Sequence, residues 1–111
     1  MRPIAVLAAV LLFVTAASSR GQSPDPAEFK NPPLAARPHT WWHWMNGNVS
    51  RAGITADLEA MKRIGLGGAQ IFNVSENIPE GSVVYNTPEW RGLVKFAASE
   101  AGRLGLVGRV E

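Results

Sequence analysis

Apolar and polar residues are arranged along the chain so that strands and helices are predicted in turn. Apolar positions spaced three and four residues apart predict one helix from about Ile54 to Ile64 and another from Pro88 to Leu104. Short β-rich segments at residues 40–45, 69–73 and 106–110 flank these helices. The predicted order is βαβαβ, which is typical of a parallel sheet with right-handed helical crossovers.

Residues at the ends of both predicted helices support them. Ser50 and Thr87 are candidate N-caps, while Gly65 and Gly105 are candidate left-handed residues just after the last turn. The two helix ends, Arg-Ile-Gly-Leu-Gly-Gly and Arg-Leu-Gly-Leu-Val-Gly, recur at an offset of forty residues. This repeat is typical of successive βα units, although a chance match is the alternative, because Arg-Leu-Gly is a common helix ending.

The first residues of the chain predict a targeting segment. Arg2 is followed by an apolar run from Ile4 to Ala17 and then by two serines. A short basic start, an apolar run of this length and small residues after it are typical of a secretory signal peptide. We therefore predict a signal peptide over residues 1–21 and export to the periplasm or the cell exterior, with no membrane partner after cleavage.

A proline-rich segment connects the signal peptide to the predicted domain. Residues 22–38 hold five of the eight prolines, which disfavour helices and central strands. We predict an extended leader that contains no helix and lies against the domain through Phe29 and Leu34. The domain itself spans residues 39–111.

Charge and cysteine content exclude several classes of function. Of the eleven basic residues, Arg2 and Arg20 lie in the predicted signal peptide, so nine remain against nine acidic residues. After the predicted signal peptide, the chain therefore has no excess of basic residues for a nucleic-acid partner. It contains no cysteine, which excludes disulfides, thiolate metal sites and a cysteine nucleophile.

Residues 41–48, Trp-Trp-His-Trp-Met-Asn-Gly-Asn, carry the most specific chemistry and hold three of the four tryptophans. Indole faces stack on sugar rings, and amide and imidazole groups hydrogen-bond to hydroxyls. The segment therefore predicts a sugar-binding subsite at the ends of the first two strands; the alternative is that two of the three indoles fill a core. The candidate substrate-binding residues are His43, Trp44, Asn46, Asn48, Gln70 and Asn73.

Each candidate also has a structural interpretation. His43 fits a core histidine bonded to backbone, and the asparagines Asn46 and Asn48 fit turn chemistry. Gln70 stands between apolar residues, so we expect it to be buried with a hydrogen-bond partner. No second histidine stands at ligand spacing, so no metal site is predicted.

The sequence assigns no catalytic residue. Glu76 and Glu80 fall in the loop after the second strand, on the side where barrel enzymes carry their chemistry. We interpret both as solvated loop acids. Inverting hydrolysis needs an acid and a base roughly 6.5–9.5 Å apart, and no such pair is evident.

The chain resembles glycoside hydrolase family 106, whose members are exported bacterial α-L-rhamnosidases. The tryptophan run and the Gly-Gly-Ala-Gln strand occur in the same order as in that family. The segments that carry the resemblance are residues 31–33, 37–38, 41–49, 53–62, 65, 67–72 and 88–90.

The resemblance has several implications for fold and activity. It implies that residues 39–111 are the first βαβαβ units of a (β/α)8 barrel of the TIM type, here incomplete. It also implies inverting hydrolysis of terminal α-L-rhamnosyl linkages in a rhamnose-containing oligo- or polysaccharide, with calcium near the sugar. No cofactor site is evident in this chain itself.

Two departures from the family alter the expected activity. Family members run to many hundreds of residues, and their third strand continues through a His-Asn pair, whereas this chain reads Val107–Glu111 and ends. We therefore expect a truncated fragment that does not hydrolyse an aryl α-L-rhamnoside alone. The alternative is a non-catalytic carbohydrate-binding or interaction module that folds by pairing with another chain.

Overall fold

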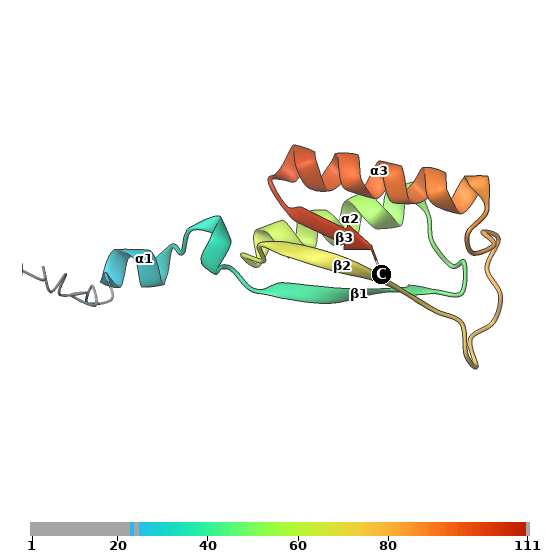
Figure 1. The fold of residues 1–111 in the computed structure, drawn as a ribbon, viewed down its shortest axis with the longest axis horizontal. Helices are drawn as coiled ribbons and strands as arrows, with labels where there is room; N and C mark the ends of the chain where they lie inside the picture. The colour runs from blue at the N-terminus through green and yellow to red at the C-terminus, as the bar shows by residue number, and fades with distance from the viewer. Residues whose placement is uncertain (1–22, 24, 111) are drawn as a thin grey trace, which may run out of the picture.

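The computed structural model describes residues 23 and 25–110, and within them two helices cover one face of a three-stranded sheet (Figure 1). The predicted signal peptide, residues 1–21, lies outside the described residues. The α/β class and the βαβαβ order are confirmed. The elements of the domain are β1 (His39–Met45), α2 (Arg51–Arg63), β2 (Gly68–Val74), α3 (Pro88–Leu104) and β3 (Val107–Val110).

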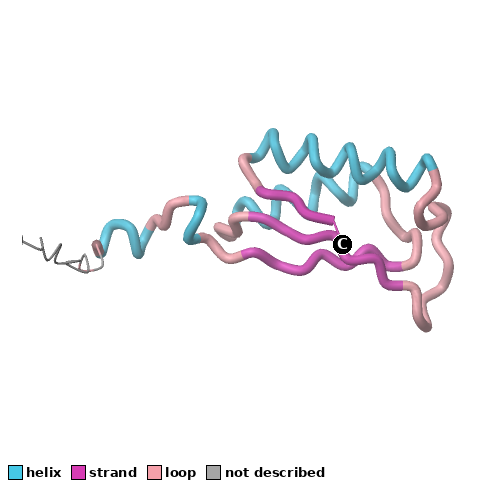
Figure 2. The backbone as a smooth tube through the Cα atoms, viewed as in Figure 1, coloured by secondary structure: helices cyan, strands magenta, loops and turns pink. Residues whose placement is uncertain are grey.

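The strands pair in sequence order, and both pairs are parallel. β1 and β2 pair along their whole length, from His39 opposite Gly68 to Met45 opposite Val74. The carboxyl ends of both strands therefore meet at one edge of the sheet, and the loops that leave them begin there (Figure 2). This edge is where a parallel α/β sheet gathers residues from different strands.

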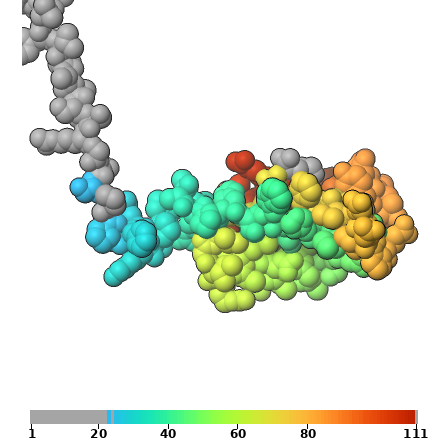
Figure 3. All heavy atoms as spheres, turned by 90° about the horizontal axis from the view of Figure 1, so that it is seen from below, coloured from blue at the N-terminus to red at the C-terminus, as the bar shows by residue number. Residues whose placement is uncertain are grey.

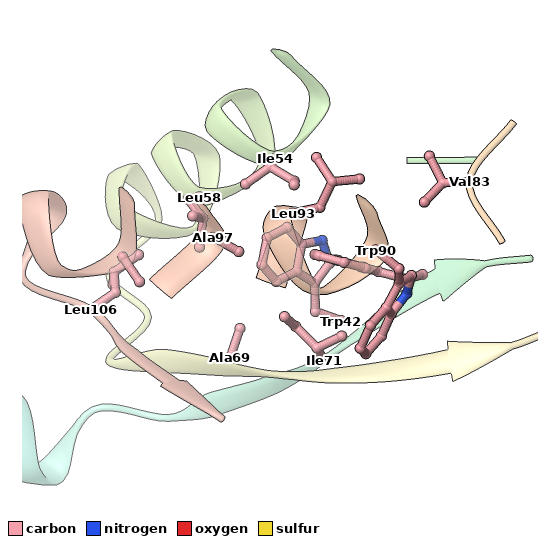
Figure 4. Close-up of a cluster of buried hydrophobic side chains, with 12 residues drawn as sticks. Trp42, Ile54, Leu58, Ala69, Ile71, Val83, Trp90, Leu93, Ala97 and Leu106 are labelled. Carbon is pink, nitrogen blue, oxygen red and sulfur yellow. The ribbon is translucent and has the colours of Figure 1, made fainter. Parts of the chain in front are cut away.

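The core lies between the sheet and the two helices, where side chains from both layers point toward one another (Figure 4). The predicted helical stripe of α2 contributes Ile54 and Leu58, which are the most completely buried large side chains. Ile64 was expected in this stripe but is 73% exposed, because it follows the last residue of α2 as its C-cap. The buried cluster consists of Trp42, Trp44, Ile54, Leu58, Ala69, Ile71, Val83, Trp90, Leu93, Ala97, Ala101 and Leu106.

The predicted helix caps are confirmed. The Ser50 hydroxyl accepts a hydrogen bond from Gly53 N–H at 3.1 Å, and the Thr87 hydroxyl accepts one from Trp90 N–H at 3.3 Å. After each helix a glycine has positive φ, and the next leucine donates its N–H back to the last turn: Leu66 to Met61 O and Leu106 to Ala101 O. This shared ending explains the sequence repeat, since both helices must turn sharply into a strand.

The proline-rich leader is not extended throughout, so that prediction is wrong. It contains a short helix, α1 (Pro26–Lys30), and a 3₁₀ turn, η1 (Leu34–Ala36). Pro26 is the first helical residue, where its missing N–H costs nothing, and Asp25 caps the turn by accepting from Ala27 N–H at 2.9 Å.

The predicted anchors of the leader do not hold it to the domain. Phe29 is 87% exposed and Leu34 is 45% exposed. In Figure 3 the blue residues of α1 stand off from the domain. The leader packs closely against the domain only near its end, where Arg37 and the backbone carbonyl of Leu34 lie so close to Gly67 that a Cβ there would clash.

Among the residues that the structure describes, none of the helices has the length and apolar character needed to cross a membrane.

A surface network joins the two helices and predicts a pH dependence. Glu100 on α3 accepts hydrogen bonds from Arg103 and from Thr55 of α2, both at 2.9 Å. These bonds, from Arg103 first and then Thr55, hold the pKa of the Glu100 carboxyl below its ordinary value of 4.5. A lowered pKa in the folded state stabilises the fold above the pKa of the unfolded chain, and this stabilisation is lost as the pH falls through the folded value.

We therefore expect Glu100→Gln to lower the free energy of unfolding near neutral pH and to have no such effect in strong acid. The effect should be small, because exposed ion pairs contribute little. Urea unfolding of both proteins across the acid range measures the difference. A difference that stays constant through this range would show that the charge of Glu100 is irrelevant.

Candidate functional site

The strand β1 divides the tryptophan run between the two faces of the sheet. Successive side chains of a strand point to opposite faces. Trp42 and Trp44 face the helices and are only 8% and 3% exposed, which confirms the alternative that two of the three indoles fill the core. Trp41 and His43 point to the other side, where Trp41 is 66% exposed. We call this side the open face: it comprises Trp41, His43, Met45, Gln70 and Phe72.

An aromatic cluster occupies the open face. The rings of Trp41 and Phe72 stack with centroids 5.6 Å apart and planes at 7°. His43 meets both rings edge-on, at 6.1 Å from Trp41 and 5.9 Å from Phe72. The indole, the phenyl and the imidazole thus form one exposed surface with a polar edge.

Trp41 and Phe72 were not among the predicted site residues. Side chains alternate between the two faces along β1, so the sequence could have placed Trp41 on one face and Trp42 and Trp44 on the other. Which of the two faces is covered cannot be read from that alternation, because both faces carry apolar residues. The packing of α2 and α3 makes that choice.

The structure does not place Trp44 where a sugar could reach its indole face. Its ring meets those of Trp42 at 5.6 Å and Trp90 at 5.9 Å, edge-on in both cases, within the core. Burying so large an apolar ring is strongly favourable, so the inward-facing positions of β1 take the indoles.

Asn46 and Asn48 lie at the carboxyl end of β1 and bind the loop that follows β2. Asn46 Nδ2 donates to Ile78 O at 2.7 Å, and Asn48 Nδ2 donates to Pro79 O at 2.9 Å and to Met45 O at 2.8 Å. Asn46 has a positive φ of 45°, as asparagine tolerates in turns. The turn interpretation of these two residues is therefore confirmed. Their side chains also bind carbonyls that lie more than thirty residues further along the chain.

His43 and Gln70 lie on the open face. His43 is exposed, so the interpretation as a core histidine is wrong. Gln70 stands opposite Trp41 in the register and is only partly buried, so the expectation that it is a buried, partnered amide is also wrong. The amide of Gln70 is thus adjacent to the aromatic cluster and is reachable by solvent.

Asn73 faces the helices rather than the open face. It stands opposite Trp44 in the register. Within the described part of the chain, Asn73 Oδ1, Trp44 Nε1 and Trp90 Nε1 are buried and have no hydrogen-bond partner. By contrast, Trp42 Nε1 donates to Asp57 Oδ2 at 2.9 Å. Asn73 therefore belongs to the packed layer beneath α3.

The acidic residues of the β2–α3 loop are solvated. Glu76 and Glu80 are both exposed, which confirms their interpretation as solvated loop acids. Among residues 23 and 25–110, no three His, Asp or Glu side chains come together in a group that could hold a metal ion. We therefore derive no step through the calcium that the family resemblance implies.

Comparison with known proteins identifies the class and then the family. A solved structure of a rhamnosidase from Novosphingobium sp. PP1Y matches with a TM-score of 0.72 and 48% identity over 79% of this chain and 9% of that one. A protein of Formosa agariphila named "Putative beta-glucuronidase" is 48% identical over 101 residues, which are 86% of this chain and 9% of that protein. Both names denote glycoside hydrolases.

The family model for glycoside hydrolase family 106, described as alpha-L-rhamnosidase, matches residues 30–110. The chain belongs to this family, as the sequence resemblance predicted. It spans about a tenth of the length of the two relatives, so its fold is that of a small α/β segment similar to part of a rhamnosidase.

Proposed function

We propose that this chain forms the first βα units of an exported glycoside hydrolase that acts on α-L-rhamnosyl linkages of a polysaccharide. We further propose that its open face contacts the sugar. The observation that carries this proposal is the exposed cluster of Trp41, His43 and Phe72 on the open face, in which His43 and Phe72 stand two residues before the carboxyl ends of their parallel strands. The apolar run at residues 4–17 supports export.

The topology supports membership of a (β/α)8 barrel. Strands follow one another in the order β1-β2-β3, and both helices lie on the same face of the sheet (Figure 1). One half of a doubly wound sheet has the same strand order and the same placement of helices, so membership of glycoside hydrolase family 106 is what favours the barrel here. In a barrel the helix-covered face is outside and the opposite face lines the interior, which assigns the open face to the interior.

The chemistry of the open face supports contact with a sugar. A stacked indole and phenyl offer an apolar surface for the C–H face of a pyranose ring. His43 and Gln70 add groups that can bond to hydroxyls at its edge. In a TIM-type barrel, the ligand is bound at the carboxyl ends of the strands, and His43 and Phe72 stand near these ends.

A second candidate ligand is a β-glucuronide. The relative named as a beta-glucuronidase has the same 48% identity to this chain as the rhamnosidase. The polar groups of the open face can hydrogen-bond to the hydroxyls of either sugar. An experiment with both sugars is therefore needed to choose between the two candidates.

Titration of the full chain with methyl α-L-rhamnoside and, separately, methyl β-D-glucuronide tests the proposal by NMR of the indole N–H signals. We expect the rhamnoside to shift the Trp41 signal with a Kd on the order of millimolar, since one aromatic surface provides few contacts. Trp41→Ala should weaken binding at least about tenfold, while Phe29→Ala, which removes an exposed aromatic ring from the leader, should not. Shifts with the glucuronide alone favour the second candidate, and no shift with either sugar contradicts both.

A further inference from the structure

The loop between β2 and α3, residues 75–87, is bound to the turn at residues 46–48 by both side chains and backbone. We call residues 46–48 the asparagine turn. Besides the amide bonds of Asn46 and Asn48, Gly81 N–H donates to Asn46 O at 2.7 Å and Val83 N–H donates to Gly47 O at 3.3 Å. The loop also buries Val83, which is 5% exposed, in the core. Two loops from different βα units therefore form one structure.

This structure stands directly at the carboxyl edge of the open face. Met45 is opposite Val74 in the register, and Asn46 N–H donates to Val74 O at 2.7 Å, so the asparagine turn extends the strand pairing by one residue. His43 and Phe72 stand two residues before these strand ends, on the open face. The first residues of the β2–α3 loop are thus held next to the aromatic cluster.

The side chain of Asn48 has a role that few other residues can take. Its amide nitrogen donates one proton to Met45 O within its own turn and the other to Pro79 O in the loop. A carboxylate of the same shape has no proton to donate, and a hydroxyl has only one.

We propose that Asn48 and Asn46 are positioning residues of the sugar site, which hold the β2–α3 loop as a preformed wall beside the open face. The inference rests on the proposed function, because the wall matters only if the open face binds sugar. A loop that is already ordered adds no ordering cost when the ligand binds, whereas a released loop must be ordered each time. Loss of these bonds should therefore weaken sugar binding even in a folded chain.

The test compares four variants of the full chain: Asn48→Ala, Asn48→Asp, Asn46→Gly and the control Asn77→Gly. Asn77 is exposed in the same loop and also has a positive φ, 58°, so glycine reproduces its backbone without removing a bond to the asparagine turn. Asn46→Gly keeps the positive φ and the backbone bond to Gly81 and removes only the amide bond to Ile78. Hydrogen exchange of the Gly81 and Val83 amides reports loop order, and the Kd for methyl α-L-rhamnoside reports function.

In the Asn48 variants, faster exchange of these two amides is expected, together with a Kd raised about tenfold at a temperature where circular dichroism shows each variant folded. A smaller rise is expected for Asn46→Gly and none for Asn77→Gly. A purely structural role would lower the melting temperature and leave the Kd of the folded chain unchanged, which overturns the inference while the proposed function stands. If the unmodified chain does not bind the rhamnoside, the proposed function fails and the inference falls with it. If the Asn48 variants do not fold, the Kd of Asn46→Gly is compared with that of Asn77→Gly. A higher Kd in Asn46→Gly supports the inference, and equal values overturn it.

Discussion

Trp44→Ala is expected to lower the free energy of unfolding by about 3–5 kcal/mol, whereas Trp41→Ala is expected to change it by no more than about 0.5 kcal/mol. Both substitutions remove the same side chain from the same strand, three residues apart. Trp44 is 3% exposed and packs against two further indoles, so its removal leaves a cavity. Trp41 is 66% exposed, and its removal leaves the core intact.

Urea unfolding followed by circular dichroism measures this difference. Small domains are stable by only roughly 0.05–0.15 kcal/mol per residue, so Trp44→Ala should leave much of the chain unfolded without denaturant. Equal losses in the two variants would mean that the open face is also packed in solution. That result would remove the basis for a sugar contact at Trp41.

Gly47→Ala is expected to lower the free energy of unfolding by about 2–5 kcal/mol, which is the second large effect. Gly47 has a φ of 78°, which costs a residue with a side chain about 1–2 kcal/mol. A Cβ there would also lie 2.1 Å from Val83 O, a backbone atom that can move only if the β2–α3 loop moves. Displacing a packed segment adds about 1–3 kcal/mol.

Gly65→Ala is the matched control for Gly47→Ala. Gly65 has a similar φ of 89°, but a Cβ there would meet nothing within 4 Å. We expect only the conformational cost of about 1–2 kcal/mol. The melting temperatures of the two variants measure the difference, and hydrogen exchange of the Val83 amide shows whether the loop has moved. If both variants lose the same stability, the contact between the asparagine turn and the loop contributes nothing.

Local signals in the sequence were sufficient for the elements and their ends. Ser50 and Thr87 cap helices because their hydroxyls reach backbone N–H groups three residues away. The glycines after each helix adopt a left-handed conformation readily because glycine has no Cβ. Proline content misled the prediction for the leader, because the position of Pro26 within its turn matters more than the number of prolines nearby.

The candidate site was predicted less well than the fold. The tryptophan run correctly indicated the strand and the family, and His43 and Gln70 do lie on the open face. Trp44 and Asn73 were chosen by their place near strand ends, yet both face the helices. Trp41 and Phe72 meet only because β1 and β2 pair in a particular register, which no local pattern specifies.

The amino-acid sequence by itself therefore determined the order of strands and helices, their caps and the family, since each depends on neighbouring residues or on characteristic segments. The tertiary structure alone decided which indoles are buried and which carbonyls receive the amides of Asn46 and Asn48. Those choices depend largely on groups that are distant in the sequence: Asn46 reaches Ile78 O across 32 residues, Asn48 reaches Pro79 O across 31, and Trp44 packs against Trp90 of α3. Such groups meet only when the helices cover one face of the sheet and burial of apolar area selects that face.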